Sequence, residues 1–311
     1  MTTAYYTHSD CAGHDMGRGH PERPERLAAI EDHLRATGLD AALERRDAPL
    51  ARTESLVLAH DPAHVAHLRG LLEQVREAGR PAALDADTIA APGTLAAVLR
   101  AAGAAVAATD AVLDGAARNA FCAVRPPGHH ATHDQAMGFC FFNNVAVAAR
   151  HALDVRGLER VAIVDFDVHH GNGTEDIVAG DERILMVGIF QSPLYPGSGE
   201  IPLGPNVCNL PIPPYTRGPA VRQAIEDGWL ARLDAFAPQM LFVSAGFDAH
   251  REDELGQLGL VEADYAWMTE RLVEIADRHA GGRIVSCLEG GYALGALARS
   301  VAAHLRVLSG G

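Results

Sequence analysis

The sequence has few cysteines and few aromatic residues. Its five cysteines are scattered along 311 residues without a Cys-x-x-Cys pair, at Cys11, Cys122, Cys140, Cys208 and Cys287. An odd number of unclustered thiols argues against a disulfide framework and is typical of a reducing cytoplasm, so we expect a cytoplasmic protein. Aromatic residues make up only 5% of the chain, whereas alanine is frequent, which favours helices that cover a sheet.

Basic residues are too few to balance the acidic ones, and the net charge is −14. A protein that binds nucleic acid carries a basic surface, so we expect no nucleic-acid partner. An acidic chain is compatible with a cationic substrate, although acidity often serves only solubility.

Signals for a membrane or for export are missing as well. The first ten residues lack the basic and apolar regions of a signal peptide. No apolar run reaches the roughly 18 residues of a membrane span, because the Ala-rich segment 95–117 contains Arg100, Asp110 and Asp114. We therefore expect no membrane partner.

The length and overall composition of the chain are ordinary for a soluble globular enzyme. A chain of 311 residues lies within the range of single α/β domains, and 48% hydrophobic with 21% charged residues is ordinary for a globular protein. The sequence contains no linker, repeat or low-complexity tract, so we predict one domain over 1–311.

Apolar runs predict strands that alternate with helices, which indicates an α/β fold with a mostly parallel sheet. The predicted strands cover 4–6, 121–124, 161–164, 184–190, 240–245 and 284–288. The predicted helices cover 24–37, 145–153, 219–235, 262–279 and 294–308, with an Ala-rich helix after Pro92-Gly93 and two short helices between 56 and 72. We expect a loop over 191–215 and another helix that Thr174 caps.

The stretch 160–175, RVAIVDFDVHHGNGTE, combines a buried strand with polar residues at its carboxyl end. If the backbone stays extended, Asp165, Asp167 and His169 share one face, and Phe166 and His170 point away. Carboxylate oxygens and an imidazole at the carboxyl end of a parallel strand suit a divalent metal such as zinc or iron. A single Asp or His at such a place is usually a turn or cap residue, but three in alternate register, followed by His170 and Asn172, make a metal site an equal alternative.

Three other predicted strands also end in unusual polar groups, which are the pair His129-His130, Asp248 and Tyr292. The carboxyl ends of parallel strands lie at one edge of the sheet, so all these groups should meet. Asp167, His169 and Asp248 would give three metal ligands and leave a position open, as catalytic zinc sites do.

The other polar groups suit the hydrolysis of an amide or ester at that metal. His129 or His130 could move the proton of a bound water, with Asp165 and Asn172 available to orient a ring. Tyr292 could donate a hydrogen bond to a developing oxyanion. An isolated tyrosine after Gly-Gly is more often a packing residue, and a His-His pair can lie in an ordinary loop.

Several motifs in this order resemble the zinc-dependent histone deacetylase family. They are HPERPERL, RPPGHHA, GFCFFNN, VDFDVHHGNGT, SAGFDAH and EGGY, and together they extend over nearly the whole chain. The resemblance implies an arginase-like fold with an eight-stranded parallel sheet, and a zinc ion at the base of a narrow tunnel for acyl-lysine. Asn172, where some members carry aspartate, points to the class II-like branch.

Matched to the family's motifs, the residues acquire individual roles. The resemblance implies that Asp167, His169 and Asp248 bind zinc, that His130 is the general base and acid oriented by Asn172, and that His129 is its companion held by Asp165. It implies that Tyr292 polarises the amide carbonyl. It places Gly138, Phe139, Tyr195 and Leu255 along the tunnel, with Asp87 at its rim as the residue that holds the substrate backbone.

The resemblance also implies a structural potassium ion held through the segment of Asp165, Asp167 and His169. Gly188 and Phe190 depart from the family here, because relatives commonly carry serine and histidine. A hydroxyl that would face the potassium ion is therefore missing.

The expected function is the removal of acetyl or other acyl groups from lysine side chains of proteins or peptides. The alternative is an acetylpolyamine amidohydrolase, which would place a carboxylate at the tunnel mouth, and Glu254 is adjacent to Leu255. A third possibility is a silent acyl-lysine binding module, which the intact ligands and Tyr292 disfavour. The oligomeric state does not follow from the sequence.

Overall fold

The computed structural model describes residues 2–310 and contains one sheet of eight parallel strands. Their order across the sheet is β2-β1-β5-β10-β9-β6-β7-β8. The strands are β1 (Thr3–Thr7), β2 (Leu43–Asp47), β5 (Asn119–Cys122), β6 (Val161–Asp165), β7 (Ile184–Gln191), β8 (Val207–Ile212), β9 (Leu241–Ala245) and β10 (Ile284–Leu288). The predicted α/β class and the eight-stranded parallel sheet are thus confirmed. A separate hairpin pairs β3 (Ala82–Ala83) with β4 (Ile89–Ala90).

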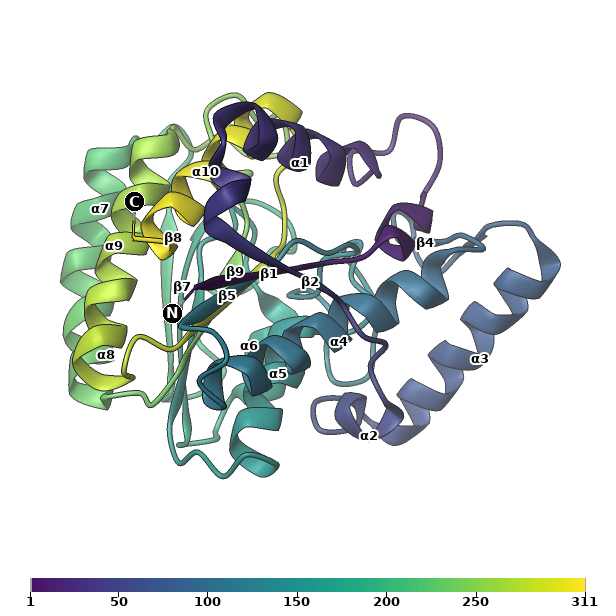
Figure 1. Cartoon of the computed structure of the whole chain (residues 1–311), viewed down its shortest axis with the longest axis horizontal. Helices are drawn as coiled ribbons and strands as arrows, with labels where there is room; N and C mark the ends of the chain where they lie inside the picture. The colour runs from purple at the N-terminus through teal and green to yellow at the C-terminus, as the bar shows by residue number, and fades with distance from the viewer. Residues whose placement is uncertain (1, 311) are drawn as a thin grey trace.

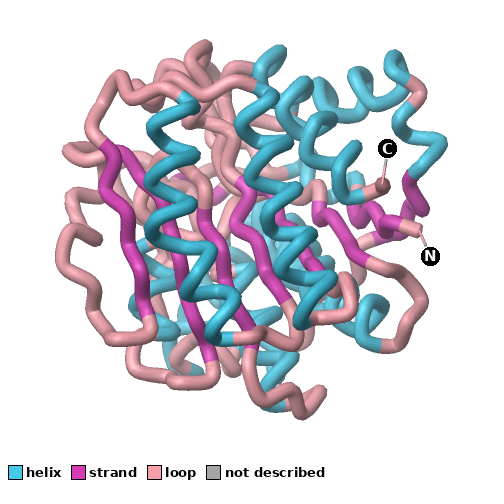
Figure 2. Tube along the Cα trace, turned by 90° about the vertical axis from the view of Figure 1, so that its left-hand side faces the viewer, coloured by secondary structure: helices cyan, strands magenta, loops and turns pink. Residues whose placement is uncertain are grey.

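Helices cover both faces of the sheet (Figures 1 and 2). One group packs together as α1 (Glu25–Thr37), α7 (Gly218–Ile225), α8 (Ala231–Phe236), α9 (Glu262–His279) and α10 (Leu294–Leu308). The opposite side carries α2 (Thr53–Leu56), α3 (Pro62–Ala78), α4 (Thr94–Leu113), α5 (Asn144–Asp154) and α6 (Asn172–Val178). Shorter turns are η1 (Ser9–Gly13), η2 (Leu39–Ala42) and the π-helical η3 (Glu226–Leu230). The strand–helix alternation therefore encloses the sheet on both faces.

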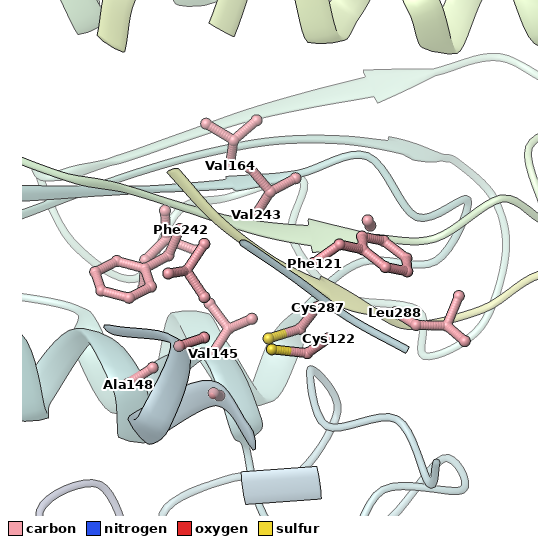
Figure 3. Packing of buried hydrophobic residues seen from close by; sticks show 14 of the residues in the cluster. Phe121, Cys122, Val145, Ala148, Val164, Phe242, Val243, Cys287 and Leu288 are labelled. Atoms are coloured by element: carbon pink, nitrogen blue, oxygen red, sulfur yellow. The ribbon is translucent and has the colours of Figure 1, made fainter. Parts of the chain in front are cut away.

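The central strands are apolar on both faces because helices cover both. All five residues of β6, β9 and β10 are buried. Figure 3 shows Phe242 and Val145 filling the space between the sheet and α5. In the same view Cys122 and Cys287 lie side by side, as expected from their pairing in register across β5 and β10. Both are free thiols that pack as small apolar groups, as predicted.

By length and composition α4 is apolar enough to cross a membrane, which the sequence analysis did not expect. It packs against α5, β5 and η1, and two thirds of its apolar window is buried inside the protein. These contacts are those of a core helix, which passes the same test of hydropathy.

Several element predictions were wrong in detail, among them the second of the two short helices between 56 and 72, which is the longer α3. The charged strand β2 was missed, and β8 lies inside the predicted loop 191–215. Both are edge strands, and their mixed exposure removes the apolar run that identifies a central strand. The helix expected after Thr174 begins at Asn172. The helix expected over 219–235 divides into α7, η3 and α8.

Candidate active site

The end of β6 is shaped by two aspartate side chains that bond to the backbone. The amide of Asp167 donates to Asp165 Oδ1 at 3.0 Å, and the amide of His169 donates to Asp167 Oδ1 at 2.9 Å. Such turns bend the chain after Asp165, so the predicted extended backbone is wrong beyond the strand. The bends nevertheless bring the side chains of Asp167 and His169 together, as predicted.

Asp248, which follows β9, completes a cluster with Asp167 and His169. One possible ligand atom from each residue lies within 4.8 Å of the other two. His169 Nδ1 is 3.0 Å from Asp167 Oδ1 and 3.2 Å from Asp248 Oδ2. β6 and β9 are neighbours in register, so their carboxyl ends put the two aspartates side by side.

The three side chains of this cluster offer ligand atoms and space that suit a divalent cation. Asp248 Oδ2 is buried and accepts no hydrogen bond, which is costly unless another group binds it. Two glycines leave the space around the carboxylates open. A Cβ at Gly246 would lie 2.0 Å from Asp167 Oδ2, and one at Gly290 would lie 1.9 Å from Asp248 Oδ2. Two carboxylate oxygens and one imidazole nitrogen form a donor set suited to zinc or iron.

The electrostatics of the cluster also favour a cation. Burial and the charge of Asp167 raise the pKa of Asp248 to about 7. Burial lowers the pKa of His169, but Asp167 and Asp248 outweigh burial and raise it to about 10. The two carboxylates thus hold a proton on His169, and a bound cation would take the place of that positive charge.

The adjacent histidines His129 and His130 have different partners. His129 Nδ1 is 3.0 Å from Asp165 Oδ2, and His130 Nδ1 is 2.8 Å from Asn172 Oδ1. Since Asn172 Oδ1 can only accept, it fixes the proton of His130 on Nδ1 and leaves Nε2 as an acceptor.

The same partners push the pKa values of the two histidines apart. Burial lowers the pKa of His129, but Asp167 and Asp165 outweigh burial and raise it to about 10. Burial, His129 and His169 lower the pKa of His130 well below its usual value. One ring is therefore a cation and the other a neutral base, 4.0 Å apart between their centroids.

Tyr292 follows β10 and lines the same cavity as His130 and His169. The backbone amides of Tyr292 and Ala293 both donate to Asp253 Oδ2, at 2.6 and 2.9 Å. The guanidinium of Arg26 lies 4.9 Å from the centre of the Tyr292 ring, and its Nε donates to the carbonyl of Gly291. Burial raises the pKa of Tyr292 well above its usual value, so its hydroxyl remains a hydrogen-bond donor.

A cavity of about 240 Å³ leads from these groups to the surface. It is lined by Asp87, His130, Gly138, Phe139, His169, Leu194, Tyr195, Leu255 and Tyr292. Phe139 and Tyr195 stand at its sides, with the Phe139 ring 6.0 Å from that of Tyr292 and the Tyr195 ring 5.2 Å from that of His130. Each substrate-binding residue predicted from the sequence lies on this wall, and Leu194 is an addition.

The two neighbours in the loop after Asp248 take different positions. Leu255 is half-buried and lines the cavity, whereas Glu254 is exposed and lines a separate cavity on the outside. The amide of Leu255 donates to Asp253 Oδ1 at 3.1 Å, so one carboxylate fixes both Leu255 and the backbone of Tyr292. Asp253 is not among the site residues predicted from the sequence.

The segment that was expected to hold potassium lies beside Gly188, which offers it no side chain. Asp165 in β6 is opposite Gly188 in β7, and a Cβ at Gly188 would lie 3.7 Å from the carbonyl oxygen of Asp165. Position 188 therefore faces the segment, but glycine offers it no hydroxyl. Phe190 packs against the ring of His170 instead.

A buried ion network beneath the site was also missed. Arg125 donates to both oxygens of Glu22, and Arg26 Nη1 donates to Glu22 Oε1 at 3.0 Å. Despite burial, the charge of Arg125 lowers the pKa of Glu22 to about 2. These residues belong to the motifs HPERPERL and RPPGHH, so the signal was present, but the sequence gave no reason to pair Glu22 with Arg125.

Glu289 was a second missed residue. Its carboxylate is fully buried below His129, where Oε2 accepts from the amides of Gly128 at 2.6 Å and His129 at 3.1 Å. Ser244 Oγ donates to the other oxygen at 3.3 Å. Glu289 therefore fixes the backbone of the histidine pair from below.

The sheet and the site define an α/β protein with an arginase-like fold and a candidate metal centre at the base of a tunnel. The model of the family described as "Histone deacetylase domain" matches residues 20–308. The chain belongs to the histone deacetylase family, as the resemblance predicted.

Relatives and a solved structure agree with this membership. The chain is 40% identical to the "Histone deacetylase-like amidohydrolase" of Pseudomonas aeruginosa over 88% of this chain and 73% of that protein. It is 36% identical to a "Probable deacetylase" of Archaeoglobus fulgidus over 94% of this chain and 82% of that protein. The "Crystal Structure of HDA15 HD domain" has a TM-score of 0.91 at 31% identity and covers 100% of this chain and 90% of that one. Membership supports a deacetylase-type amidohydrolase activity, and the family is generally metal-dependent.

Proposed function

We propose that this protein is a zinc-dependent deacylase that removes acetyl or other acyl groups from lysine side chains of proteins or peptides. The observation that carries this proposal is Leu255, which lines the cavity where a polyamine enzyme would need a carboxylate. A narrow cavity with Phe139, Tyr195 and Leu255 on its wall suits the aliphatic stem of an acyl-lysine.

Asp167, His169 and Asp248 would hold the zinc ion, with ferrous iron as the alternative. When bound, such an ion polarises a carbonyl and lowers the pKa of a water molecule. The carboxylates that bind it are buried and immobile, since amides of Val168 and Gly290 donate to Asp248 Oδ1 and Asp167 Oδ2 at 2.9 and 2.8 Å.

The protein's own groups would divide the proton transfer. His130 Nε2 would accept a proton from the attacking water and return it to the lysine nitrogen of the leaving group. Asn172 holds that ring in the required tautomer. His129 keeps its proton through Asp165, and so it would stabilise negative charge rather than transfer a proton. The hydroxyl of Tyr292 would donate to the oxygen that becomes an oxyanion.

An acetylpolyamine amidohydrolase is the second candidate, and the exposed carboxylate of Glu254 is the observation that favours it. Glu254 lines a cavity of about 470 Å³ that adjoins the tunnel through Leu255 and Tyr292. A distal ammonium that emerged from the tunnel could meet that carboxylate. The pair would be exposed and worth at most about 1 kcal/mol.

Other parts of the proposal concern the surroundings of the enzyme. The described cysteines are all buried free thiols, which is compatible with the proposed cytoplasmic location. We also propose a structural potassium ion near Asp165, Asp167 and His169, whose binding is weakened by glycine at position 188.

Asp87, beside Asp85 in the loop between β3 and β4, would hold the substrate backbone at the rim of the tunnel.

A single profiling experiment would test the proposal. The zinc-loaded protein is given acetyl-lysine peptides, longer acyl-lysine peptides and acetylputrescine, and kcat/KM is measured for each. The proposal requires at least one acyl-lysine peptide to exceed acetylputrescine, and the reverse order would make the polyamine reaction the function. Because the chain contains no lysine, every acyl-lysine detected by mass spectrometry belongs to the substrate.

A further inference from the structure

A second cavity of about 470 Å³ is formed in part by the residues that directly follow Leu255 in the chain. It is lined by Tyr215, Arg217, Arg251 and the segment 256–259. Leu255 lines the tunnel and the next residue, Gly256, lines this cavity, so consecutive residues of one loop line the two spaces. We call it the arginine cavity.

Backbone hydrogen bonds fix the arrangement of the arginine cavity. The amide of Gly259 donates to the carbonyl of Thr216 at 2.8 Å, and the amide of Arg251 donates to the carbonyl of Leu260 at 2.9 Å. The segment 257–260 is therefore held between residues 215–217 on one side and 249–251 on the other. Arg217 and Arg251, far apart in the sequence, thus reach one space from two sides.

The charge of this cavity is opposite to that of the chain. The net charge is −14, yet the lining contains two arginines and no aspartate or glutamate. Within residues 2–310, no carboxylate lies within ion-pair distance of Arg217 or Arg251, whereas Arg183 and Arg299 each pair with two. The cavity that Leu255 lines together with Glu254 is acidic instead, with Glu252, Asp253 and Glu254 in its lining.

Tyr215 gives an independent sign of a binding role. Its ring is 75% exposed, although its backbone has a φ of 65°, a conformation that bulky residues rarely adopt. Its amide is held by a 2.7 Å hydrogen bond to the carbonyl of Gln257. The other aromatic residue with positive φ is Phe139 at 68°, which forms the tunnel wall. Strained backbone that presents an aromatic ring is typical of ligand sites.

We propose that the arginine cavity binds an acidic side chain of the peptide that carries the acyl-lysine. This inference rests on the proposed function, since it describes what surrounds the tunnel once an acyl-lysine is inside. Guanidinium groups match the geometry of a carboxylate, and the open Tyr215 ring offers a surface for the adjoining backbone. An acetylated polyamine has no carboxylate, so the cavity contributes nothing to its binding.

The test compares three acetyl-lysine peptides that differ only in flanking residues, which are glutamate, glutamine or arginine. We expect KM for the glutamate peptide to be about fivefold to tenfold below that of the glutamine peptide at low salt, because two exposed ion pairs contribute modestly. The advantage should shrink at about 0.5 M salt, where exposed charges are screened. kcat should be the same for both peptides.

Variants assign the effect to the cavity. Arg217→Gln and Arg251→Gln should each remove about threefold of the preference, and the double variant should remove all of it. Arg306→Gln is the matched control, because Arg306 is also an exposed arginine without a carboxylate partner among the described residues 2–310, but lies on α10. Equal KM values for the glutamate and glutamine peptides, or a preference that survives in the double variant, would overturn the inference.

A binding measurement separates this inference from the proposed function. Fluorescein-labelled forms of the same peptides are titrated with the zinc-loaded protein, and anisotropy gives Kd. If no peptide is hydrolysed but the glutamate peptide binds tighter through Arg217 and Arg251, the proposed function fails and the cavity assignment stands. If peptides are hydrolysed and Kd is indifferent to the flanking charge, only the cavity assignment fails.

Discussion

The base of the candidate site and its mouth are built in different ways. At the base, Asp167 and Asp248 are fully buried, follow adjacent strands and are held by backbone amides. At the mouth, Leu255 is half-buried and its neighbour Glu254 is exposed, and both lie on an irregular loop. The chemistry therefore depends on the sheet, whereas the choice of substrate depends on which side chains of an irregular loop enter the tunnel.

The largest effect should come from removing a ligand at the base. Asp167→Ala, His169→Ala or Asp248→Ala should each abolish activity and strip the metal, because three ligands leave no spare one. Metal content is measured in the purified variants beside turnover. Full occupancy in any of these variants would show that the substituted residue is not a ligand.

The histidine pair should give the next largest effect. His130→Ala should lower kcat by about 10²–10⁴-fold, because this ring would both accept and return the proton. His129→Ala should lose less, since Asp165 holds the Nδ1 of that ring and the ring would not transfer the proton. The reverse order of the two kcat values would mean that their roles are exchanged.

Tyr292→Phe should lower kcat by about 10²–10³-fold, as the loss of one oxyanion donor does. The metal content should stay unchanged, because Tyr292 is not one of the three metal ligands. A kcat within about threefold of the wild type would contradict the donor role.

The network below the site should govern stability in acid. The folded protein holds the pKa of Glu22 at about 2 instead of 4.5, so its stabilising effect is present above pH 4.5 and is lost as the pH falls toward 2. That difference corresponds to about 3 kcal/mol. Urea midpoints between pH 6 and pH 2.5 would measure it.

Glu22→Gln supplies the control for this stability effect. It leaves Arg26 and Arg125 buried without a counter-charge, so we expect about 3–5 kcal/mol of destabilisation at neutral pH. Stability of this variant should depend less on pH between 4.5 and 2. An acid dependence equal to that of the wild type would place the responsible group elsewhere.

The smallest effect should come from the outside of the mouth. Glu254→Leu should change the ratio of peptide to polyamine kcat/KM by less than tenfold, because Glu254 does not line the tunnel. Leu255→Glu is the complementary variant, since it brings a carboxylate to the tunnel wall and should favour acetylputrescine. A tenfold loss of polyamine turnover in Glu254→Leu, with peptide turnover intact, would make the polyamine reaction the better assignment.

The sequence alone determined the central elements and the floor of the site. Uniform apolar runs identified β6, β9 and β10, because strands covered on both faces must be apolar throughout. Polar residues after those runs had to meet, because parallel strands end at one edge. The edge strands β2 and β8 escaped prediction, since one free edge removes the apolar signal.

The tertiary structure decided what local pattern cannot express. Whether Leu255 or Glu254 enters the tunnel depends on the hydrogen bond from Leu255 to Asp253, which also holds Tyr292. Glu22 and Arg125 form an ion pair although they are far apart in the chain. Arg217 and Arg251, also distant in sequence, line one cavity. Side-chain direction in irregular loops follows from such long-range contacts, because no repeating backbone geometry fixes it there.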